Sequence, residues 1–476
     1  MIRSALIIVP HPDDEINVAG GLFETLQANG IYTSVAICTN GDHVPEFTAK
    51  RIREAQKAQR IFKYQELIFL GYGDGYRGTH IYDSKEGDAV ESYCGKKETY
   101  CAGNTKEYCC SKTGKHHSYI RGNYKKDIKA LINEKKADLI VCVDLDKHSD
   151  HKCVSLLFDE CMGEILKRDC NYRPIILKAF AYNGVWFGPY DYFDTILKQT
   201  SIKLSAGDTI EEKCFPYNWE DRIRIRNSRN ISTLYYWKNP IFKALLAHRT
   251  QSDYYKLRYC ALQFFPKIAN PDSCYWYRSP YNIVLYSQIT VSSGDGHYLN
   301  DFMLAKPKNA INDILPINSE GWSPDINDKE PTIEIAFPRQ ICLKEIKIYQ
   351  NYNSARGIIK IQLEGKDEME YLCTNDNVQK IAIPSVLTQK LFLQFVSGGH
   401  IIINEIECYE SNSDFPWQDV PFSKYEHRVV QRNMILAKSA DFSYRIFIRS
   451  IKLFSKWKAI LNKGGNNRKN SVISLE

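Results

Sequence analysis

Titratable residues gather at two points in the first third of the chain. The first group, HPDDE at residues 11–15, follows an apolar run at residues 4–9, and the second, HSDH at residues 148–151, follows an apolar run at residues 137–143. Carboxylates that lose their water together repel one another, so such a group at the end of a buried strand is costly without a cation. Each group therefore predicts either an exposed loop or a site for a positively charged ligand.

The spacing within the two groups suits a catalytic metal ion. His11 and Asp14 are three residues apart, so both side chains can point to one place if the strand turns into a helix there, with Asp13 beside them. His148 and His151 have the same spacing. Two imidazoles and a carboxylate around one divalent ion leave positions for water, which is typical of catalytic rather than structural zinc.

The elements that must position these residues alternate between strands and helices, which is typical of an α/β domain with a mainly parallel sheet. Ligands of such sheets bind at the carboxyl ends of the strands, where the polar groups at 10–15, 39–42 and 144–151 are expected to lie. We expect strands at residues 4–10, 32–40 and 137–146, a strand and turn at residues 66–75, and helices at residues 20–30, 46–63 and 123–136.

In their order and placement, the two groups resemble the PIG-L (LmbE-like) family of zinc-dependent N-acetylglucosamine deacetylases. TNGD at residues 39–42, RIREAQKA at 51–58 and KALLAHRTQ at 243–251 are similar to further motifs of that family. The resemblance spans residues 1–286 and implies a Rossmann-like, mainly parallel sheet with helices on both faces. A cysteine-bearing insertion at residues 93–117 is unusual for the family.

The resemblance also implies roles for individual residues. It implies hydrolysis of the acetyl amide of an N-acetylglucosamine-type sugar or glycoconjugate by metal-activated water. The alternatives are a zinc amidohydrolase for another acylated amine and a non-catalytic glycan-binding protein on a hydrolase scaffold. The implied set is one Zn²⁺ held by His11, Asp14 and His151, with Asp13 as the general base, His148 as the group that stabilises the oxyanion or protonates the amine, and Arg53, Asp42 and Asp74 as substrate contacts.

The remaining histidines and cysteines carry weaker signals. His43, His80, His116 and His117 are predicted to be surface residues, whereas His248 either shapes the site or is a hydrogen-bonded core residue. Many of the fifteen cysteines lie in apolar runs, which favours reduced thiols. Cys94, Cys101, Cys109 and Cys110 of the insertion match no CxxC pair pattern, and a loop of free thiols, a structural zinc site and disulfides all stay open.

Residues 287–410 change to short alternating strands without helices between them, which predicts an all-β sandwich. The segments INDILPINSEGWSPD, PTIEIAF, LKEIKIYQ and INEIECYE resemble the discoidin (factor 5/8 type C) family of galactose-binding-like modules. This resemblance implies glycan contact through loops, with Trp322 or Tyr352 as exposed aromatic residues that stack on a sugar. A purely structural platform is the alternative.

Residues 411–476 are predicted to form a helical basic tail with a disordered end. Of the net charge of +7, about +9 lies after residue 420, so the rest of the chain is slightly acidic and a nucleic-acid partner is disfavoured. Residues 444–461 predict a basic amphipathic helix that binds a membrane peripherally or packs on the protein. Without a leader or a spanning segment, we expect a cytoplasmic protein, at the inner membrane face if the tail helix binds lipid.

Overall fold

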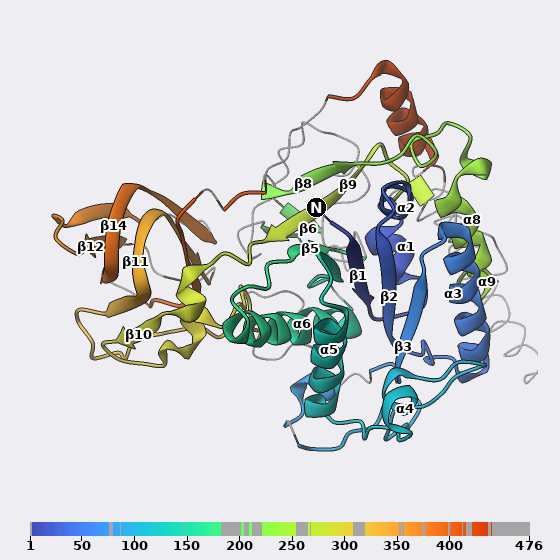
Figure 1. Ribbon diagram of the computed structural model, residues 1–476, viewed down its shortest axis with the longest axis horizontal. Helices are drawn as coiled ribbons and strands as arrows, with labels where there is room; N and C mark the ends of the chain where they lie inside the picture. The colour runs from blue at the N-terminus through green and yellow to red at the C-terminus, as the bar shows by residue number, and fades with distance from the viewer. Residues whose placement is uncertain are drawn as a thin grey trace, which may run out of the picture.

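The computed structural model describes most of the chain and forms two domains side by side (Figure 1). The described residues are 2–75, 80–85, 87–146, 148–181, 201–203, 209–211, 221–253, 265–266, 268–307, 319–351, 354, 357–373, 377–397, 400–411, 413–415, 421–436 and 439.

The N-terminal domain is built on a seven-stranded sheet of order β3-β2-β1-β4-β5-β9-β8. The first five strands in this order are parallel, and β9 and β8 add an antiparallel edge. Leu6 to Val9 are fully buried, as expected for a strand covered on both faces. The strands are β1 (Ser4–Val9), β2 (Tyr32–Thr39), β3 (Glu66–Tyr72), β4 (Leu139–Val143), β5 (Ile175–Ala179), β8 (Ile223–Arg226) and β9 (Asp272–Arg278).

Helices cover both faces of this sheet. The chain moves outward from β1 to β3 and then returns to β4 and β5, so right-handed crossovers place α1–α3 on one face and α5 and α6 on the other (Figure 1). The predicted α/β fold is confirmed. The helices are α1 (Asp14–Ala19), α2 (Phe23–Ala28), α3 (Thr48–Phe62), α4 (Tyr108–Thr113), α5 (Arg121–Lys135), α6 (Ser149–Arg168), α8 (Pro240–Ala247) and α9 (Arg249–Asp253).

The reversal of direction lies between β1 and β4, which are hydrogen-bonded neighbours with Ile8 opposite Cys142. In sheets of this kind, the crevice outside the carboxyl ends of these two strands is where ligands bind. The HPDDE segment follows β1, and the HSDH segment follows β4. The topology therefore brings the two titratable groups to one crevice.

The second domain is an antiparallel β-sandwich, as the sequence predicted. Its main sheet has the order β10-β11-β14-β12-β13, with β15 paired to β11. The strands are β10 (Gln288–Val291), β11 (Thr332–Gln350), β12 (Gly357–Leu363), β13 (Met369–Leu372), β14 (Val378–Ser397) and β15 (Ile403–Tyr409); a separate two-stranded pair is β6 (Ser201–Lys203) with β7 (Thr209–Glu211).

Trp322 is not the exposed aromatic that the sequence suggested. Its side chain is fully buried in the core of the sandwich, and its Nε1 donates a hydrogen bond to the carbonyl oxygen of Ser293 at 2.8 Å. It therefore offers no face to a sugar. Tyr352, the other suggested residue, lies outside the described residues.

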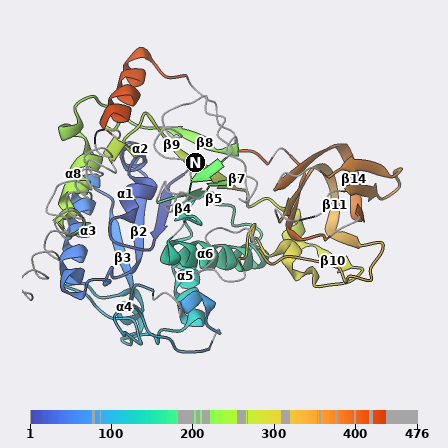
Figure 2. The same ribbon diagram turned by 180° about the vertical axis from the view of Figure 1, so that it is seen from behind.

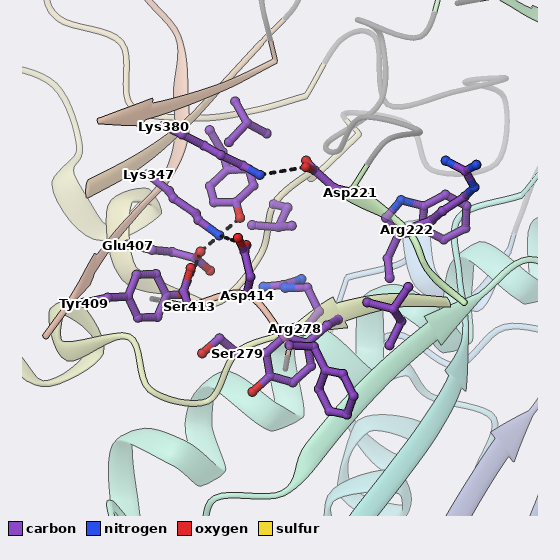
Figure 3. A pocket seen from close by; sticks show the side chains of 17 residues that line it. Asp221, Arg222, Arg278, Ser279, Lys347, Lys380, Glu407, Tyr409, Ser413 and Asp414 are labelled. Atoms are coloured by element: carbon purple, nitrogen blue, oxygen red, sulfur yellow. Dashed lines mark hydrogen bonds and ion pairs between the residues drawn. The ribbon is translucent and has the colours of Figure 1, made fainter. Parts of the chain in front are cut away.

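The two domains share a hollow of about 190 Å³ at their junction (Figure 3). Lys380 of β14 binds Asp221, just before β8, at 2.7 Å, and Lys347 of β11 binds Asp414 at 3.5 Å. None of the HPDDE or HSDH residues lines this hollow. The Lys380–Asp221 pair joins the two domains at this hollow, so the junction and the titratable crevice are separate features.

The described part of the tail includes a helix at residues 424–436 that packs on the N-terminal domain (Figure 2). Asn433 donates from Nδ2 to the carbonyl oxygen of Ala269 at 2.8 Å, and Arg226 binds Glu426 at 3.2 Å. The amphipathic helix predicted at 444–461 lies outside the described residues. No helix within the described ranges is long and apolar enough to cross a bilayer.

Gly163 of α6 provides a test of the domain junction. A Cβ at this position would lie 2.3 Å from the carbonyl oxygen of Asp301, which lies between β10 and β11 of the sandwich. Gly→Ala within a helix normally stabilises by about 1 kcal/mol, but here overpacking against backbone should reduce the free energy of unfolding by about 1–3 kcal/mol. Urea denaturation of Gly163→Ala measures the change.

Gly87→Ala is the matched control, because a Cβ there would meet nothing within 4 Å and Gly87 lies in an exposed turn. Its free energy of unfolding should stay near that of the wild type. Stabilisation of the protein by Gly163→Ala would contradict the close approach of α6 to residue 301.

Candidate metal centre and active site

Three histidines meet in the crevice between β1 and β4. The ring centroids of His11, His148 and His151 lie 4.7–5.3 Å apart, and one nitrogen from each ring falls within 4.8 Å of the others. His11 and His151 are buried, whereas the side chain of His148 is 39% exposed. The cluster thus has a closed side and an open side.

Asp14, the first residue of α1, lies between two of these rings. Its Oδ2 is 3.0 Å from Nδ1 of His11 and 3.2 Å from Nε2 of His151. Its other oxygen, Oδ1, is buried without a hydrogen-bond donor among the described residues. Burial alone would raise the pKa of Asp14, but the two imidazoles hold it well below its usual value. Asp14 is therefore a carboxylate that favours the charged form and still has one oxygen that accepts no hydrogen bond among the described residues.

The far nitrogen of each of these two rings is held by a further carboxylate. Asp150 lies 3.2 Å from Nε2 of His11, and Asp146 lies 2.6 Å from Nδ1 of His151. Burial alone would lower the pKa of His151, but Asp146 and Asp14 outweigh it and raise the pKa to about 9. The supporting carboxylates fix which nitrogen of each ring faces Asp14. This is the carboxylate–histidine support that surrounds metal ligands.

These residues fit a zinc ion. Ligand atoms at zinc-bond lengths of about 2.0–2.1 Å in a tetrahedron are about 3.3 Å apart, close to the 3.0 and 3.2 Å that separate Asp14 Oδ2 from the two ring nitrogens. Asp14 Oδ1 has no hydrogen-bond donor among the described residues, so the carboxylate can bind a cation through both of its oxygens. These distances support His11, Asp14 and His151 as candidate ligands, the set that the family resemblance implies, and the assignment stays a prediction.

His148 is held differently from the other two histidines. It is the N-cap of α6, and its Nδ1 accepts a hydrogen bond from the backbone N–H of Asp150 at 3.2 Å. Burial, together with His151 and His11, lowers its pKa well below the usual value. A neutral imidazole that accepts at Nδ1 carries its proton on Nε2. His148 is therefore better suited to donate a hydrogen bond into the site than to bind a metal.

Asp13 stands beside the cluster in a strained backbone conformation. Its φ of 123° is one that residues other than glycine rarely adopt. Arg51 of α3 donates from Nη2 to Asp13 Oδ1 and to the carbonyl oxygen of Pro12, both at 2.9 Å, and from Nη1 to Gly41 at 3.3 Å. Burial raises the pKa of Asp13 to about 6, against the opposing charge of Arg51. A carboxylate with this pKa suits proton transfer near neutral pH.

Arg53, the predicted substrate contact, does not point into the crevice. It is exposed, and its Nε donates to the carbonyl oxygen of Ala49 in its own helix. Positions two apart on a helix differ by about 200° in direction, so only one of Arg51 and Arg53 can face the site. Arg51 is that residue, and it replaces Arg53 among the candidates.

Asp42 and Asp74 are near the cluster, but their oxygens are occupied. Asp42 accepts from the backbone N–H of Asp74 and from the hydroxyl of Tyr100, both at 2.7 Å. Asp74 accepts from Thr39 and from the backbone of His43, both at 2.8 Å. Both carboxylates are buried. They order the loops after β2 and β3, and this arrangement favours a supporting role over direct substrate contact.

His80 was expected on the surface, and this was wrong. It is 1% exposed, and its Nε2 lies 3.0 Å from Asp150 Oδ1, so it supports the carboxylate that supports His11. His248 is buried with Nε2 3.5 Å from Glu15 Oε1, behind the HPDDE turn. The sequence predicted His248 either as a residue that shapes the site or as a core residue. The structure places it in the core and next to the site.

The comparison with family models decides the relationship of the N-terminal domain. Residues 6–162 match the PIG-L model, described as GlcNAc-PI de-N-acetylase. The PIG-L resemblance is confirmed over this range. Residues 6–162 contain both histidine motifs and Arg51, so the three histidines and the carboxylates around them lie within the matched part.

Solved structures resemble each domain at low sequence identity. An N,N'-diacetylchitobiose deacetylase from Pyrococcus horikoshii is 13% identical, covering 59% of this chain and 85% of that chain, with a TM-score of 0.33. A Streptococcus pneumoniae fucose binding module is 15% identical, covering 28% of this chain and 98% of that chain, with a TM-score of 0.23. A family 32 CBM from C. perfringens is 16% identical, with 27% and 98% coverage and a TM-score of 0.21. A search of curated proteins gave no match.

Asp146→Asn tests the support of His151. The amide keeps the shape of the side chain but cannot supply the negative charge that the Nδ1 proton of His151 faces at 2.6 Å. Loss of a supporting carboxylate weakens metal binding by about 10- to 100-fold. Competition with a zinc chelator measures the affinity. Asp88→Asn, at an exposed position, is the control and should bind zinc with the affinity of the wild type. An equal zinc affinity in both variants would show that Asp146 does not support the metal site.

Proposed function

We propose that the chain is a zinc-dependent deacetylase that hydrolyses the acetyl amide of an N-acetylglucosamine-type sugar or glycoconjugate. The observation that carries the proposal is the convergence of Asp14 Oδ2 with His11 and His151, while Asp13 and His148 stand beside them with other partners. Ligands, base and hydrogen-bond donor are thus different residues. The PIG-L match over residues 6–162 supports the choice of an acetylated amino sugar.

A bound zinc ion would lower the pKa of water to about 7 and polarise the amide carbonyl. Asp13 is the proposed general base. Its Oδ1 is held by Arg51, so Oδ2 is the oxygen that takes a proton from the attacking water and later delivers it toward the amine. The ion pair between Arg51 and Asp13 fixes the direction in which the Asp13 carboxylate points.

His148 is the proposed stabiliser of the negative charge that forms on the acetyl oxygen. Its Nδ1 accepts from Asp150 N, so a neutral His148 carries its proton on Nε2, the nitrogen that donates in the proposed mechanism. Such preorganised donors typically contribute about 10²- to 10³-fold to the rate. The 39% exposure of its side chain also places His148 on the open side of the cluster, where a substrate can arrive.

Acetate release from a panel of free, nucleotide-linked and lipid-linked N-acetylhexosamines tests the function. We expect zinc-loaded wild type to release acetate and Asp13→Asn to be slower by about 10²- to 10⁴-fold, with its zinc content unchanged. The best substrate then identifies the class of glycoconjugate. If zinc-loaded protein releases no acetate from any compound of the panel, sugar deacetylation is contradicted, and the result points to another acylated amine as substrate or to a non-catalytic scaffold.

Arg51→Lys tests the positioning of the base, with Arg53→Lys as the matched control on the same helix. A lysine cannot reproduce the three contacts of the Arg51 guanidinium. We expect kcat to fall by about 10- to 100-fold, with KM and zinc content nearly unchanged. Arg53→Lys should behave as the wild type. Equal losses in the two variants would indicate a general effect of α3 and not the positioning of Asp13.

A further inference from the structure

The insertion at residues 93–117 brings a second set of metal-ligating side chains together, apart from the histidine cluster. Backbone hydrogen bonds join residues 97–99 to residues 117–119, for example Thr99 N to the carbonyl oxygen of His117 at 2.8 Å. This pairing brings Cys101, just after one segment, toward His116, just before the other. Helix α4 adds Cys110 from a third segment.

Cys101, Cys110 and His116 form a compact trio. Their ligand atoms, two thiol sulfurs and one ring nitrogen, all lie within 4.8 Å of one another. Cys101 is exposed, Cys110 is half-buried, and the side chain of His116 is 33% exposed. An ion could therefore enter from solvent, and water could complete its coordination. Two thiolates and an imidazole are ligands that Zn²⁺ prefers.

Glu107 gives the independent sign that His116 is arranged for a metal. Its Oε1 lies 2.9 Å from Nδ1 of His116 and accepts from the hydroxyl of Thr99 at 2.9 Å. Glu107 is 1% exposed, and its Oε2 is buried without a hydrogen-bond partner in the part of the chain that the structure describes. A proton on Nδ1 leaves Nε2 with the lone pair, as in histidines that bind metals. An unneutralised buried carboxylate is costly, and a cation on the ring would relieve that cost.

The neighbouring group of Cys109, His117 and Asp127 is explained without a metal. Asp127 Oδ2 accepts from the hydroxyl of Tyr72 at 2.8 Å and lies 3.0 Å from Nδ1 of His117, while Cys109 faces the hydroxyl of Thr113 at 3.5 Å. Each of the three therefore has a partner and, unlike Glu107, Asp127 has no oxygen buried without a hydrogen-bond partner in the part of the chain that the structure describes. Cys94 also has a partner, since its thiol donates to the carbonyl oxygen of Asp42 at 2.7 Å.

We propose that Cys101, Cys110 and His116 bind a second zinc ion, with Glu107 supporting His116 and water completing the tetrahedron. Of the four cysteines in the insertion, only two take part. The ion would fasten together three segments of an insertion whose helix α4 has only six residues. Since isolated helices of this length are unstable in water, a metal crosslink supplies the order that local structure does not.

The test is the metal content of the full chain, purified under reducing conditions, together with X-ray absorption at the zinc edge. The histidine cluster offers only nitrogen and oxygen ligands, so a Zn–S distance of about 2.3 Å reports on the second site alone. We expect two zinc ions per chain in the wild type. His151→Ala should keep one ion with its Zn–S signal, whereas Cys110→Ser should keep one ion without that signal.

Two further variants separate the ligands from their surroundings. His116→Gln should lose the second ion, and Cys170→Ser, at an exposed cysteine outside the insertion, should retain both ions. Because zinc content and Zn–S scattering are measured without a substrate, they are independent of whether the chain deacetylates sugars. One zinc ion per wild-type chain with no sulfur ligand would overturn the proposal.

A disulfide between Cys101 and Cys110 is the competing chemistry, and a second preparation of the same chain, purified without reductant, distinguishes it. Titration of denatured, metal-free protein with a thiol reagent should find all fifteen thiols without added reductant. A deficit of two thiols that is restored by reduction in the wild type, and is absent when Cys101 and Cys110 are both serine, would replace the zinc site by a disulfide.

Discussion

The stability of the N-terminal domain depends on how the negative charge buried in one crevice is compensated. Asp14, Asp146 and Asp150 are all at most 4% exposed, and they meet around two imidazoles at the ends of β1 and β4. Desolvated carboxylates at this density are stable only with compensating positive charge. Without a metal the compensation comes from protons, which is why the pKa values of His11 and His151 are raised despite burial. A divalent cation supplies the same charge at one point.

The fold contributes to this compensation in a way that the side chains alone do not. Asp14 lies in the first turn of α1, and Asp150 lies in the first turn of the 20-residue helix α6. The N-terminal ends of helices carry partial positive charge from unpaired N–H groups, which stabilises nearby carboxylates. The crossing order of the strands brings both helix starts to the same crevice. The topology therefore places the acidic residues where the backbone itself favours them.

The sequence predicted what depends on local pattern and missed what depends on distant packing. Strand and helix order followed from periodicity, and the candidate ligands followed from two short motifs at strand ends. His80 could not be found in this way, because its partner Asp150 is 70 residues away. Arg51 and Arg53 are the same residue type in one motif. Only the orientation of α3 against the HPDDE turn determines which of them reaches Asp13. Trp322 lies outside the regular strands, where no alternation marks a buried position.

The cysteine-bearing insertion is connected by hydrogen bonds to the candidate metal centre, although it contributes none of the candidate ligands. Tyr100, next to Cys101, donates to Asp42, and Asp42 in turn holds the backbone N–H of Asp74. Asp74 Oδ1 lies 4.0 Å from Nε2 of His11. Displacement of Tyr100 would leave a buried carboxylate without one of its donors, at a cost of about 1–3 kcal/mol. Order in the insertion is therefore transmitted to the loops that border the crevice, which gives a physical reason for a small insertion to be fastened tightly at its base.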